Sequence, residues 1–356
     1  MTNERYLKHL ADSLPKSANN YMLSTYSIIL EAWRRGLEIK IRILVEATGK
    51  IEPYFTISSS KRTHNFSATR GDKVTPESKD LVKNKKSAKE YLQKDNVPTP
   101  DGKYFDKDVQ NETIISYAND LGYPVVIKPV SGTGGEGVIA YIENDQELIN
   151  ALQYVRVKLK NQEVILEKFF KGEDYRLYVI EDKVVAALKR LPAHVIGDGK
   201  NTIRKLVALK NEERTKNPAL TDRPIKINQE TRDLLKKNNY TLDSIPEKGD
   251  IVYLKTKNNV TAGGDSIDVT DEISENIKSI AIRAREAFPD LPQCGIDLLV
   301  NEENDEAVVI EINSRAHITQ HLFPMQGTAR DVPSAIIDYY FPESIENKNE
   351  EANQLF

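Results

Sequence analysis

A glycine-rich segment between two expected strands has the composition of a phosphate-binding loop. It follows the apolar strand expected at 125–128, and another strand is expected at 138–142. Glycines let backbone N–H groups approach phosphate oxygens, and a lysine at a strand end adds a fixed positive charge. The second strand excludes a Walker loop and a dinucleotide-binding loop, because both lead into a helix. A plain β-turn explains the pattern equally well; phosphate binding would use Lys128, Gly132, Gly134, Gly135 and Gly137.

Three oxygen-bearing side chains near the C-terminal end of the chain have the types and spacing of metal ligands. Glu311 and Asn313 are two residues apart in an expected strand, so their side chains point to the same face, and Asp297 lies in the preceding strand. Mg²⁺ prefers hard oxygen ligands and bridges to substrate phosphates. The alternative is a polar, solvated strand face. We expect Glu311 to be surrounded by apolar residues of its strand, where an unpaired carboxylate is costly, and this favours a metal or cationic partner.

A third segment, residues 166–176, could bind the nucleoside part of a nucleotide. Glu167 and Lys168 end an apolar strand, and Phe170 and Asp174 lie on either side of Gly172. Backbone groups of such a segment can pair with the edge of adenine, and a carboxylate can accept a hydrogen bond from a ribose. Periodicity alone does not establish this role.

The composition limits the classes of protein to which the chain can belong. Its 50 basic and 54 acidic residues give a formal charge of −4, so no basic excess indicates a nucleic-acid or membrane partner. Cys294 is the single cysteine, which excludes an internal disulfide, and its apolar surroundings favour a buried side chain over a nucleophile. The N-terminus lacks a signal-peptide core, and no apolar run approaches the ~20 residues that cross a bilayer. We therefore expect a cytoplasmic enzyme.

The elements that must position these residues fall into three blocks of an α/β protein. Residues 1–79 are expected to form a small α/β domain, 80–160 a second block and 161–342 a third, with an acidic tail at 343–356. A polar helical insertion at 202–239 is either a solvated helical surface or a partner site. Periodicity and Gly or Pro stops predict helices at 26–36, 84–93, 113–121, 145–160 and 272–287. Strands are expected at 37–44, 125–128, 138–142, 164–168, 175–181, 183–189, 295–301 and 307–312, the last two as a hairpin.

In order and spacing, these segments resemble the ATP-grasp superfamily. Asn84 and Lys85 precede a helix that carries Lys89 and ends at Val97-Pro98, as in that family. The resemblance implies an ATP-grasp fold, in which two α/β subdomains clamp ATP, preceded here by the small N-terminal domain. It also implies an ATP site and a magnesium site; the residues are Lys85, Lys128, Gly132, Gly134, Gly135, Gly137, Glu167, Lys168, Phe170 and Asp174 for ATP, and Asp297, Glu311 and Asn313 for the metal.

A narrower resemblance joins the chain to cyanophycin synthetases and to the ligase half of bifunctional glutathione synthetases. Residues 191–203 and the Gly-Gly segment at 259–270 are similar to that group, as is the C-terminal pattern that begins at Glu311. The second, Mur-ligase-like half of the former and the γ-glutamylcysteine-forming half of the latter are missing. We therefore expect a stand-alone ligase module, whose amine acceptor does not follow from its relatives.

The resemblance implies an ATP-dependent ligase that joins a carboxylate to an amine through an acyl-phosphate. Its substrates would be a small-molecule acid and an amine, such as amino acids or short peptides, and its cofactors ATP and Mg²⁺, with two ions expected and Mn²⁺ as a substitute. Arg190 would stabilise the transferring phosphoryl group and the tetrahedral oxyanion, since its planar fork suits oxyanions; a surface salt bridge is the alternative. The residues expected to assist are Lys189, His194 as an orienting group or base with a pKa near neutrality, Arg315 and His321.

Two other functions remain open at this point. One is an ATP-binding protein without ligase activity, and the other is a phosphotransferase that leaves the phosphate on its final acceptor. By family analogy we also expect a homo-oligomer, and neither a nucleic-acid nor a membrane partner.

Overall fold

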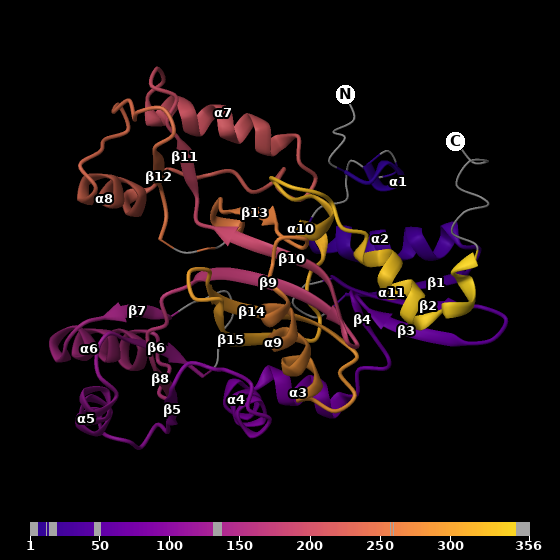
Figure 1. Ribbon diagram of the computed structural model, residues 1–356, viewed down its shortest axis with the longest axis horizontal. Helices are drawn as coiled ribbons and strands as arrows, with labels where there is room; N and C mark the ends of the chain where they lie inside the picture. Colours follow the sequence, from indigo (N-terminus) through magenta and orange to yellow (C-terminus); the bar gives the residue numbers. More distant parts are fainter. Residues whose placement is uncertain are drawn as a thin grey trace.

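The computed structural model describes residues 6–11, 13, 20–45, 51–130, 137–256, 258 and 260–346 (Figure 1). Helices and strands are interspersed along the described chain, and the strands form four sheets. This agrees with the predicted α/β class. Within the described residues, no helix is both long and apolar enough to cross a membrane.

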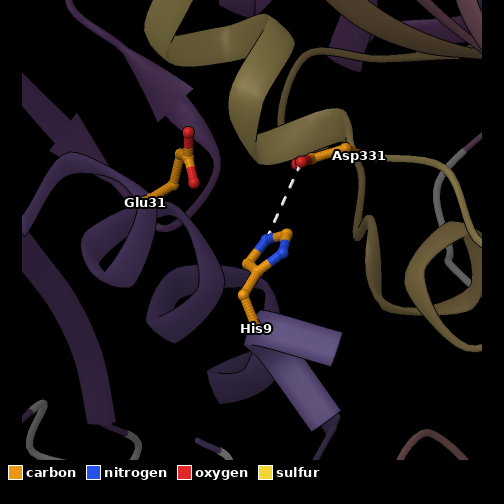
Figure 2. Close-up of side chains that lie close together, drawn as sticks. All are labelled: His9, Glu31 and Asp331. Carbon is orange, nitrogen blue, oxygen red and sulfur yellow. Dashed lines mark ion pairs between the residues drawn. The ribbon is translucent and has the colours of Figure 1, made fainter. Parts of the chain in front are cut away.

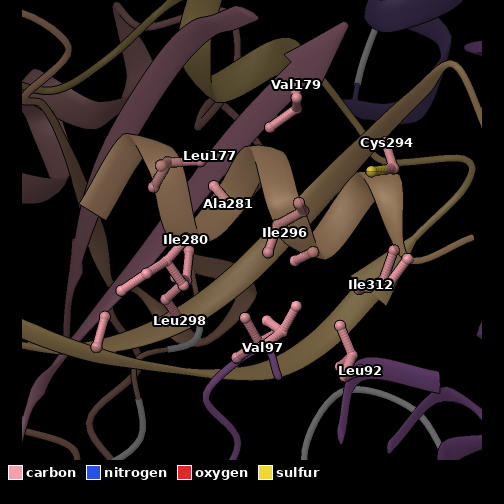
Figure 3. Close-up of a cluster of buried hydrophobic side chains, with 14 of the residues drawn as sticks. Leu92, Val97, Leu177, Val179, Ile280, Ala281, Cys294, Ile296, Leu298 and Ile312 are labelled. Carbon is pink, nitrogen blue, oxygen red and sulfur yellow. The ribbon is translucent and has the colours of Figure 1, made fainter. Parts of the chain in front are cut away.

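A five-stranded antiparallel sheet lies at the centre of the molecule (Figure 1). One face is covered by α9 (Glu275–Glu286), which begins at the N-cap Ser274. Apolar side chains of the sheet and of α9 form one of the two large buried clusters in the described part of the chain, and part of it is drawn in Figure 3. Cys294 is 1 % exposed in this cluster, as its surroundings predict, and burial raises the pKa of its thiol to about 12. The strand order is β13 (Asp265–Asp268), β10 (Lys183–Leu191), β9 (Glu173–Ile180), β14 (Gln293–Asn301) and β15 (Glu306–Asn313).

A second sheet of four strands forms a separate lobe with its own core. It consists of β5 (Gly102–Phe105), β8 (Val164–Lys168), β6 (Val125–Pro129) and β7 (Ile139–Ile142), covered by α5 (Asn111–Leu121) and α6 (Asp145–Leu152). The helix expected at 145–160 is regular only to Leu152 and continues as a π-helical segment, Gln153–Lys158. The block boundary expected at 161 falls before β8, which pairs with β5 and β6 and so belongs to this lobe.

Two helices that precede this lobe in the sequence pack instead on the central sheet. They are α3 (Pro76–Lys83) and α4 (Lys85–Lys94), whose buried Val82 and Leu92 belong to the central cluster. The Asn84 side chain caps α4 by accepting hydrogen bonds from the backbone N–H groups of the first helical turn. The chain then crosses to the second sheet after Pro98, whose carbonyl accepts from the Val309 N–H at 2.8 Å. Residues of α4 therefore lie between the two sheets.

The N-terminal block is a helix on an antiparallel sheet, docked on the C-terminal helix. Its elements are α1 (Lys8–Ala11), α2 (Asn20–Arg34), β1 (Glu38–Val45), β2 (Ile51–Ser58), β3 (Thr63–Ser67) and β4 (Arg70–Gly71). The helix and strand expected at 26–36 and 37–44 are confirmed, and Gly36 adopts the left-handed φ of 72° that a helix stop favours. Arg35 ties this block to α11 (Val332–Tyr340) through an ion pair with Asp338.

The insertion forms a small lobe that is larger than the predicted 202–239. It includes α7 (Ile203–Thr215) and α8 (Gln229–Lys237), and it is closed by the antiparallel pair β11 (His194–Ile196) and β12 (Ile251–Tyr253). Figure 1 shows it above the central sheet, away from α9. Its apolar core is separate; the buried members are Ala193, Val195, Ile203, Leu206, Val207, Ile225, Leu235, Leu242, Val252 and Leu254.

Candidate active site

A cleft lies where α4 and the second sheet face the last strand of the central sheet. It encloses about 430 Å³ of atom-free space, including its opening to solvent. Apolar side chains such as Val82, Leu92 and Ile165 line part of it. Its charged lining residues are Lys85, Lys89, Lys128, Glu167 and Glu311. The structure thus brings together residues that the sequence analysis assigned separately to nucleotide and metal.

Glu167 holds two lysines at the floor of this cleft. Its carboxylate oxygens lie 2.7 Å from the Nζ atoms of Lys89 and Lys128, and Lys89 also donates to the Pro100 carbonyl at 2.6 Å. Burial alone would raise the pKa of Glu167, but the two ammonium groups lower it below its ordinary value. One carboxylate therefore fixes two positive charges side by side, and their summed charge suits a phosphate group.

Lys85 adds a third ammonium group at the first turn of α4. Burial lowers its pKa, the charge of Glu311 opposes that shift, and the charge of Lys128 reinforces it. Lys85 and Lys128, which lie on different lobes, are therefore close enough to interact electrostatically. Three lysines and two carboxylates leave the cleft with a net positive charge.

The expected metal ligands lie on adjacent strands with their side chains on one face. Asp297 on β14 is directly opposite Glu311 on β15, and Gly295 is opposite Asn313, which confirms the predicted hairpin and its pairing. The expectation that Glu311 is buried is wrong. Glu311 is exposed to the cleft because a register shift interrupts the apolar strand just before it. The desolvation argument for a metal therefore does not apply, and the case rests on the donor set.

The donor set itself fits a hard divalent cation. Two carboxylates and an amide offer oxygen ligands, as Mg²⁺ requires. The Asn313 side-chain nitrogen is buried without a hydrogen-bond partner in the described part of the chain, so this amide is not committed to another contact through that atom. Both oxygens of Asp297 accept hydrogen bonds from Arg176, at 2.6 and 2.7 Å, and retain further acceptor sites.

Arg176 is a site residue that the sequence analysis missed. It lies on β9 opposite Asp297, and its bidentate hydrogen bonds orient that carboxylate. Arg190 on β10 pairs with Asp174 at 2.5 Å and reaches Asp297 at 3.3 Å. Burial raises the pKa of Asp174 to about 6, Arg190 opposes this rise, and Asp297 adds to it. An arginine within the otherwise apolar stretch 175–180 was the signal available in the sequence.

Lys189 and Lys168 are turned away from these groups. Lys189 is opposite Tyr175, whose ring belongs to the core on the α9 face, and it pairs with the exposed Glu302 at 2.8 Å. It therefore lies on the other face of the sheet from its neighbour Arg190. The Lys168 ammonium group donates to the carbonyls of Gly122 and Tyr123 at 2.8 and 3.1 Å.

The predicted adenine and lid segments are described in part. Phe170 is half-buried in the connection between β8 and β9. Of the glycine-rich segment, Gly132, Gly134 and Gly135 lie outside the described residues. Gly137 has a φ of 73°, and a side chain there would approach Pro129 at 3.1 Å, so the end of this segment requires glycine.

His194 lies in the insertion lobe within a buried charged cluster. Its Nδ1 is 2.9 Å from the Pro192 carbonyl, and its Nε2 is 3.4 Å from the Lys210 Nζ. Burial, followed by the charge of Lys210, lowers the pKa of His194, which corrects the expectation of a value near neutrality. The buried Asp265 completes the cluster by pairing with Lys210 and Arg214 at 2.5 and 2.6 Å.

Arg315 and His321 follow the last strand of the central sheet. Arg315 donates to Ser67 of the N-terminal sheet at 3.3 Å. His321 is fully buried, and burial together with Arg176 and Arg190 lowers its pKa to about 3, so the ring is neutral. Neither ring nitrogen has a hydrogen-bond partner within the described chain. His321 therefore lies behind the arginines and does not line the cleft.

A second group of possible metal ligands lies where α1, the C-terminal end of α2 and the start of α11 meet; it consists of His9, Glu31 and Asp331 (Figure 2). His9 Nε2 is 3.7 Å from the Asp331 carboxylate. Both oxygens of Glu31 already accept hydrogen bonds from arginines, at 3.0 Å from Arg34 and 2.7 Å from Arg35. A cation would therefore have to displace or tolerate two guanidinium groups, so this group is better explained as part of the ion-pair network between α2 and α11.

Comparison with known proteins bears on this geometry directly. A family model described as an ATP-grasp domain matches residues 82–319, which contain every cleft residue named above. The chain belongs to the ATP-grasp family. Members of this family use ATP with divalent metal ions, generally Mg²⁺.

Curated relatives agree with this ATP-grasp assignment. The cyanophycin synthetase of Crocosphaera subtropica is 35 % identical over 274 residues, covering 74 % of this chain and 31 % of that protein. The glutathione biosynthesis bifunctional protein of Enterococcus faecalis is 32 % identical over 335 residues, covering 91 % of this chain and 43 % of that protein. The chain thus matches 31 % and 43 % of the length of these two relatives, and the resemblance inferred from its motifs is confirmed.

A solved structure shows the same ATP-grasp fold. The bifunctional glutathione synthetase of Pasteurella multocida superimposes with a TM-score of 0.68 at 26 % identity, covering 90 % of this chain and 44 % of that one.

Proposed function

We propose that this ATP-grasp protein is an ATP-dependent ligase that joins a carboxylate to an amine through an acyl-phosphate. The observation that carries the proposal is the cleft in which Lys89 and Lys128, fixed by Glu167, face Glu311 on the neighbouring sheet. Positive charge on one wall and oxygen ligands on the other match the two halves of a metal–triphosphate complex.

In the first step, an oxygen of the substrate carboxylate attacks the γ-phosphorus of ATP, and the bond to the β-phosphate oxygen breaks. The products are an acyl-phosphate and ADP. Lys85 and Lys128 would hold the α- and β-phosphates, with Lys89 and Glu167 keeping Lys128 in place. Phe170 and the backbone at Glu167 and Lys168 would bind adenine.

The metal site supports the same step. Asp297, Glu311 and Asn313 would hold Mg²⁺, which neutralises developing charge on the β- and γ-phosphate oxygens when it is bound. Arg176 orients Asp297 by two hydrogen bonds. The proposal includes two Mg²⁺ ions at this site, and Mn²⁺ could replace them.

In the second step, the amine attacks the acyl carbon, the bond to phosphate breaks, and the amine loses a proton. Arg190 lies between Asp174 and Asp297, so its charge can stabilise the oxyanion of the tetrahedral intermediate. Asp174 would hold Arg190 in this position, which differs from the ribose contact expected from the sequence. Arg315 would bind the substrate carboxylate end, and Lys189 and His194 would act only indirectly.

The substrates would be amino acids or short peptides, as the names of the relatives suggest by analogy. The sequence-based predictions of a homo-oligomer and a cytoplasmic location stay predictions.

The test is ADP release and hydroxamate formation with hydroxylamine as the amine, using a panel of amino acids and dipeptides as acids. Glu311→Gln should lower ADP release by at least ~100-fold because it weakens transition-state neutralisation by the metal. Glu306→Gln, at the exposed start of the same strand, is the matched control and should behave like the wild type. Wild-type turnover in the Glu311 variant would contradict the metal assignment. A stable phosphorylated product formed without amine would indicate a phosphotransferase.

A further inference from the structure

The connection between α7 and α8 in the insertion rests on the segment that follows β15. Ala219 and Leu220 are buried in the same apolar cluster as Ala316 and Ile318. The Asn217 side chain donates a hydrogen bond to the Phe323 carbonyl at 3.0 Å. Residues 217–223, which come from the insertion, are thus held against the chain that leaves the metal-binding strand.

Arg223, at the end of this connection, has a fixed backbone. Its carbonyl accepts a hydrogen bond at 2.9 Å from Nε of Arg214, which is 1 % exposed and also pairs with Asp265 at 2.6 Å. Two residues later, both backbone groups of Ile225 bond to the Asn211 side chain, at 2.7 and 3.1 Å. The buried charged cluster of the insertion therefore fixes the backbone position from which the Arg223 side chain extends.

The guanidinium group of Arg223 is partly buried and lacks a partner. No hydrogen bond or ion pair joins its side chain to another part of the chain that the structure describes; the carboxylate whose charge acts on it is its neighbour Asp222. Burial lowers the pKa of Arg223, so this charge is held at a cost. Charged groups removed from water are normally paired, and an unpaired one in a site suggests an anionic ligand.

Arg223 and two other arginines lie close enough to His317 for their charges to act on it. The surrounding protein atoms partly desolvate His317, whose surface is exposed, and lower its pKa to about 4, and the charges of Arg176, Arg315 and Arg223 act in the same direction. The three arginines come from β9, from the segment after β15 and from the insertion. Asp297 pairs with Arg176. Arg315 contacts Ser67. Among the described residues, Arg223 is therefore the one of these three arginines whose side chain makes no hydrogen bond or ion pair, and the carboxylate whose charge acts on it is that of Asp222.

We propose that Arg223 is a specificity-determining residue that binds a second anionic group of the acid substrate, beside the carboxylate that is activated. This inference rests on the proposed ligase function and adds a role for the insertion. Arg190 and Arg315 would act at the reacting carboxylate, and Arg223 would reach the same substrate from the insertion lobe. The substrate class is therefore an acid with at least two anionic groups.

The test compares acids that differ only by a charge: L-aspartate with L-asparagine, L-glutamate with L-glutamine, and dipeptides that end in either member of these pairs. ADP release with hydroxylamine gives kcat/KM for each probe in the wild type, Arg223→Gln, Arg223→Lys and Arg204→Gln. Arg204 lies on the same lobe, exposed and paired with Asp243, and serves as the control. Thermal unfolding of every variant checks that the fold is kept.

The wild type should prefer the charged member of at least one pair by about tenfold or more, which corresponds to one charge-assisted contact. Arg223→Gln should bring this ratio close to one, mainly through KM, while Arg223→Lys keeps part of it and Arg204→Gln keeps all of it. A wild type without preference, or a preference that survives in Arg223→Gln, would overturn the role of Arg223. An equal loss in Arg204→Gln would do the same. Absence of hydroxamate with every acid would instead reject the ligase function itself.

Discussion

The network around Arg35 and the network around Arg176 use the same side-chain types in different surroundings. Arg35 is 1 % exposed in its side chain and bonds to Glu31, Asp338 and Ser334, so each guanidinium nitrogen has an acceptor. Arg176 is 20 % exposed and donates two hydrogen bonds to a single carboxylate, that of Asp297.

The surplus charge also differs between the two networks. Two carboxylates, on α2 and α11, surround Arg35, which is the pattern of a link between distant segments. The second network pairs two arginines, Arg176 and Arg190, with the carboxylates of Asp297 and Asp174, and the neighbouring cleft holds three lysines and two glutamates. A network with every group satisfied stabilises the fold, whereas one beside a cleft with a net positive charge is suited to an anionic ligand.

Removal of Arg35 should give the largest effect on stability. Arg35→Ala leaves the carboxylates of Glu31 and Asp338 without their shared cation, and we expect a loss of ~3–5 kcal/mol in the free energy of unfolding. Chemical denaturation followed by circular dichroism measures this. Arg34→Ala is the control, because Arg34 pairs with Glu31 but not with Asp338 and its side chain is 20 % exposed. Its effect on the free energy of unfolding should be clearly smaller. Equal effects of both variants would show that the buried network is not special.

A smaller effect is expected from the pH dependence of the second network. Since burial raises the pKa of Asp174 to about 6, the folded protein binds more protons at this residue than the unfolded chain between about pH 4 and 6. Its contribution to stability is therefore fully present at the acidic end and is lost as the pH rises through this window.

Asp174→Asn removes this titration. Unfolding free energies measured from pH 4 to 7 should fall more steeply with pH in the wild type than in the variant, by about 1–2 kcal/mol across the window. The variant also removes the partner of Arg190, so its kcat should fall at pH 7 where the wild type holds a carboxylate. Parallel stability curves would show that Asp174 titrates at its ordinary value in the folded protein.

The sequence predicted the local pattern of this fold better than its lobes. The hairpin of β14 and β15, with Asp297 opposite Glu311, follows from two short apolar stretches on either side of an acidic turn. The assignment of β8 to the second sheet does not, because pairing between segments distant in the chain depends on tertiary packing. The same reason explains why α4 was not expected to pack on the central sheet.

The candidate site shows a similar division. Residue types and motif order singled out Lys85, Lys128 and the three oxygen-bearing side chains, since each carries a distinct chemistry, and their roles stay predictions. The exposure of Glu311 was not predictable, because a register shift in β15 turns it to the cleft. Arg176 was overlooked because its role depends on Asp297, which is 121 residues away and meets it only across paired strands.

Lys189 and Arg190 give the smallest and sharpest test, because neighbours in a strand point to opposite faces. Lys189 pairs with Glu302, which is 53 % exposed, and such pairs contribute ~0–1 kcal/mol. Lys189→Ala should therefore change kcat/KM less than about threefold. Arg190→Ala should cost far more, since it removes a charge beside Asp297. If the two variants lost activity equally, the side of the sheet on which a charged residue lies would not distinguish catalytic from structural residues. The contrast between the networks of Arg35 and Arg176 would then have to be abandoned.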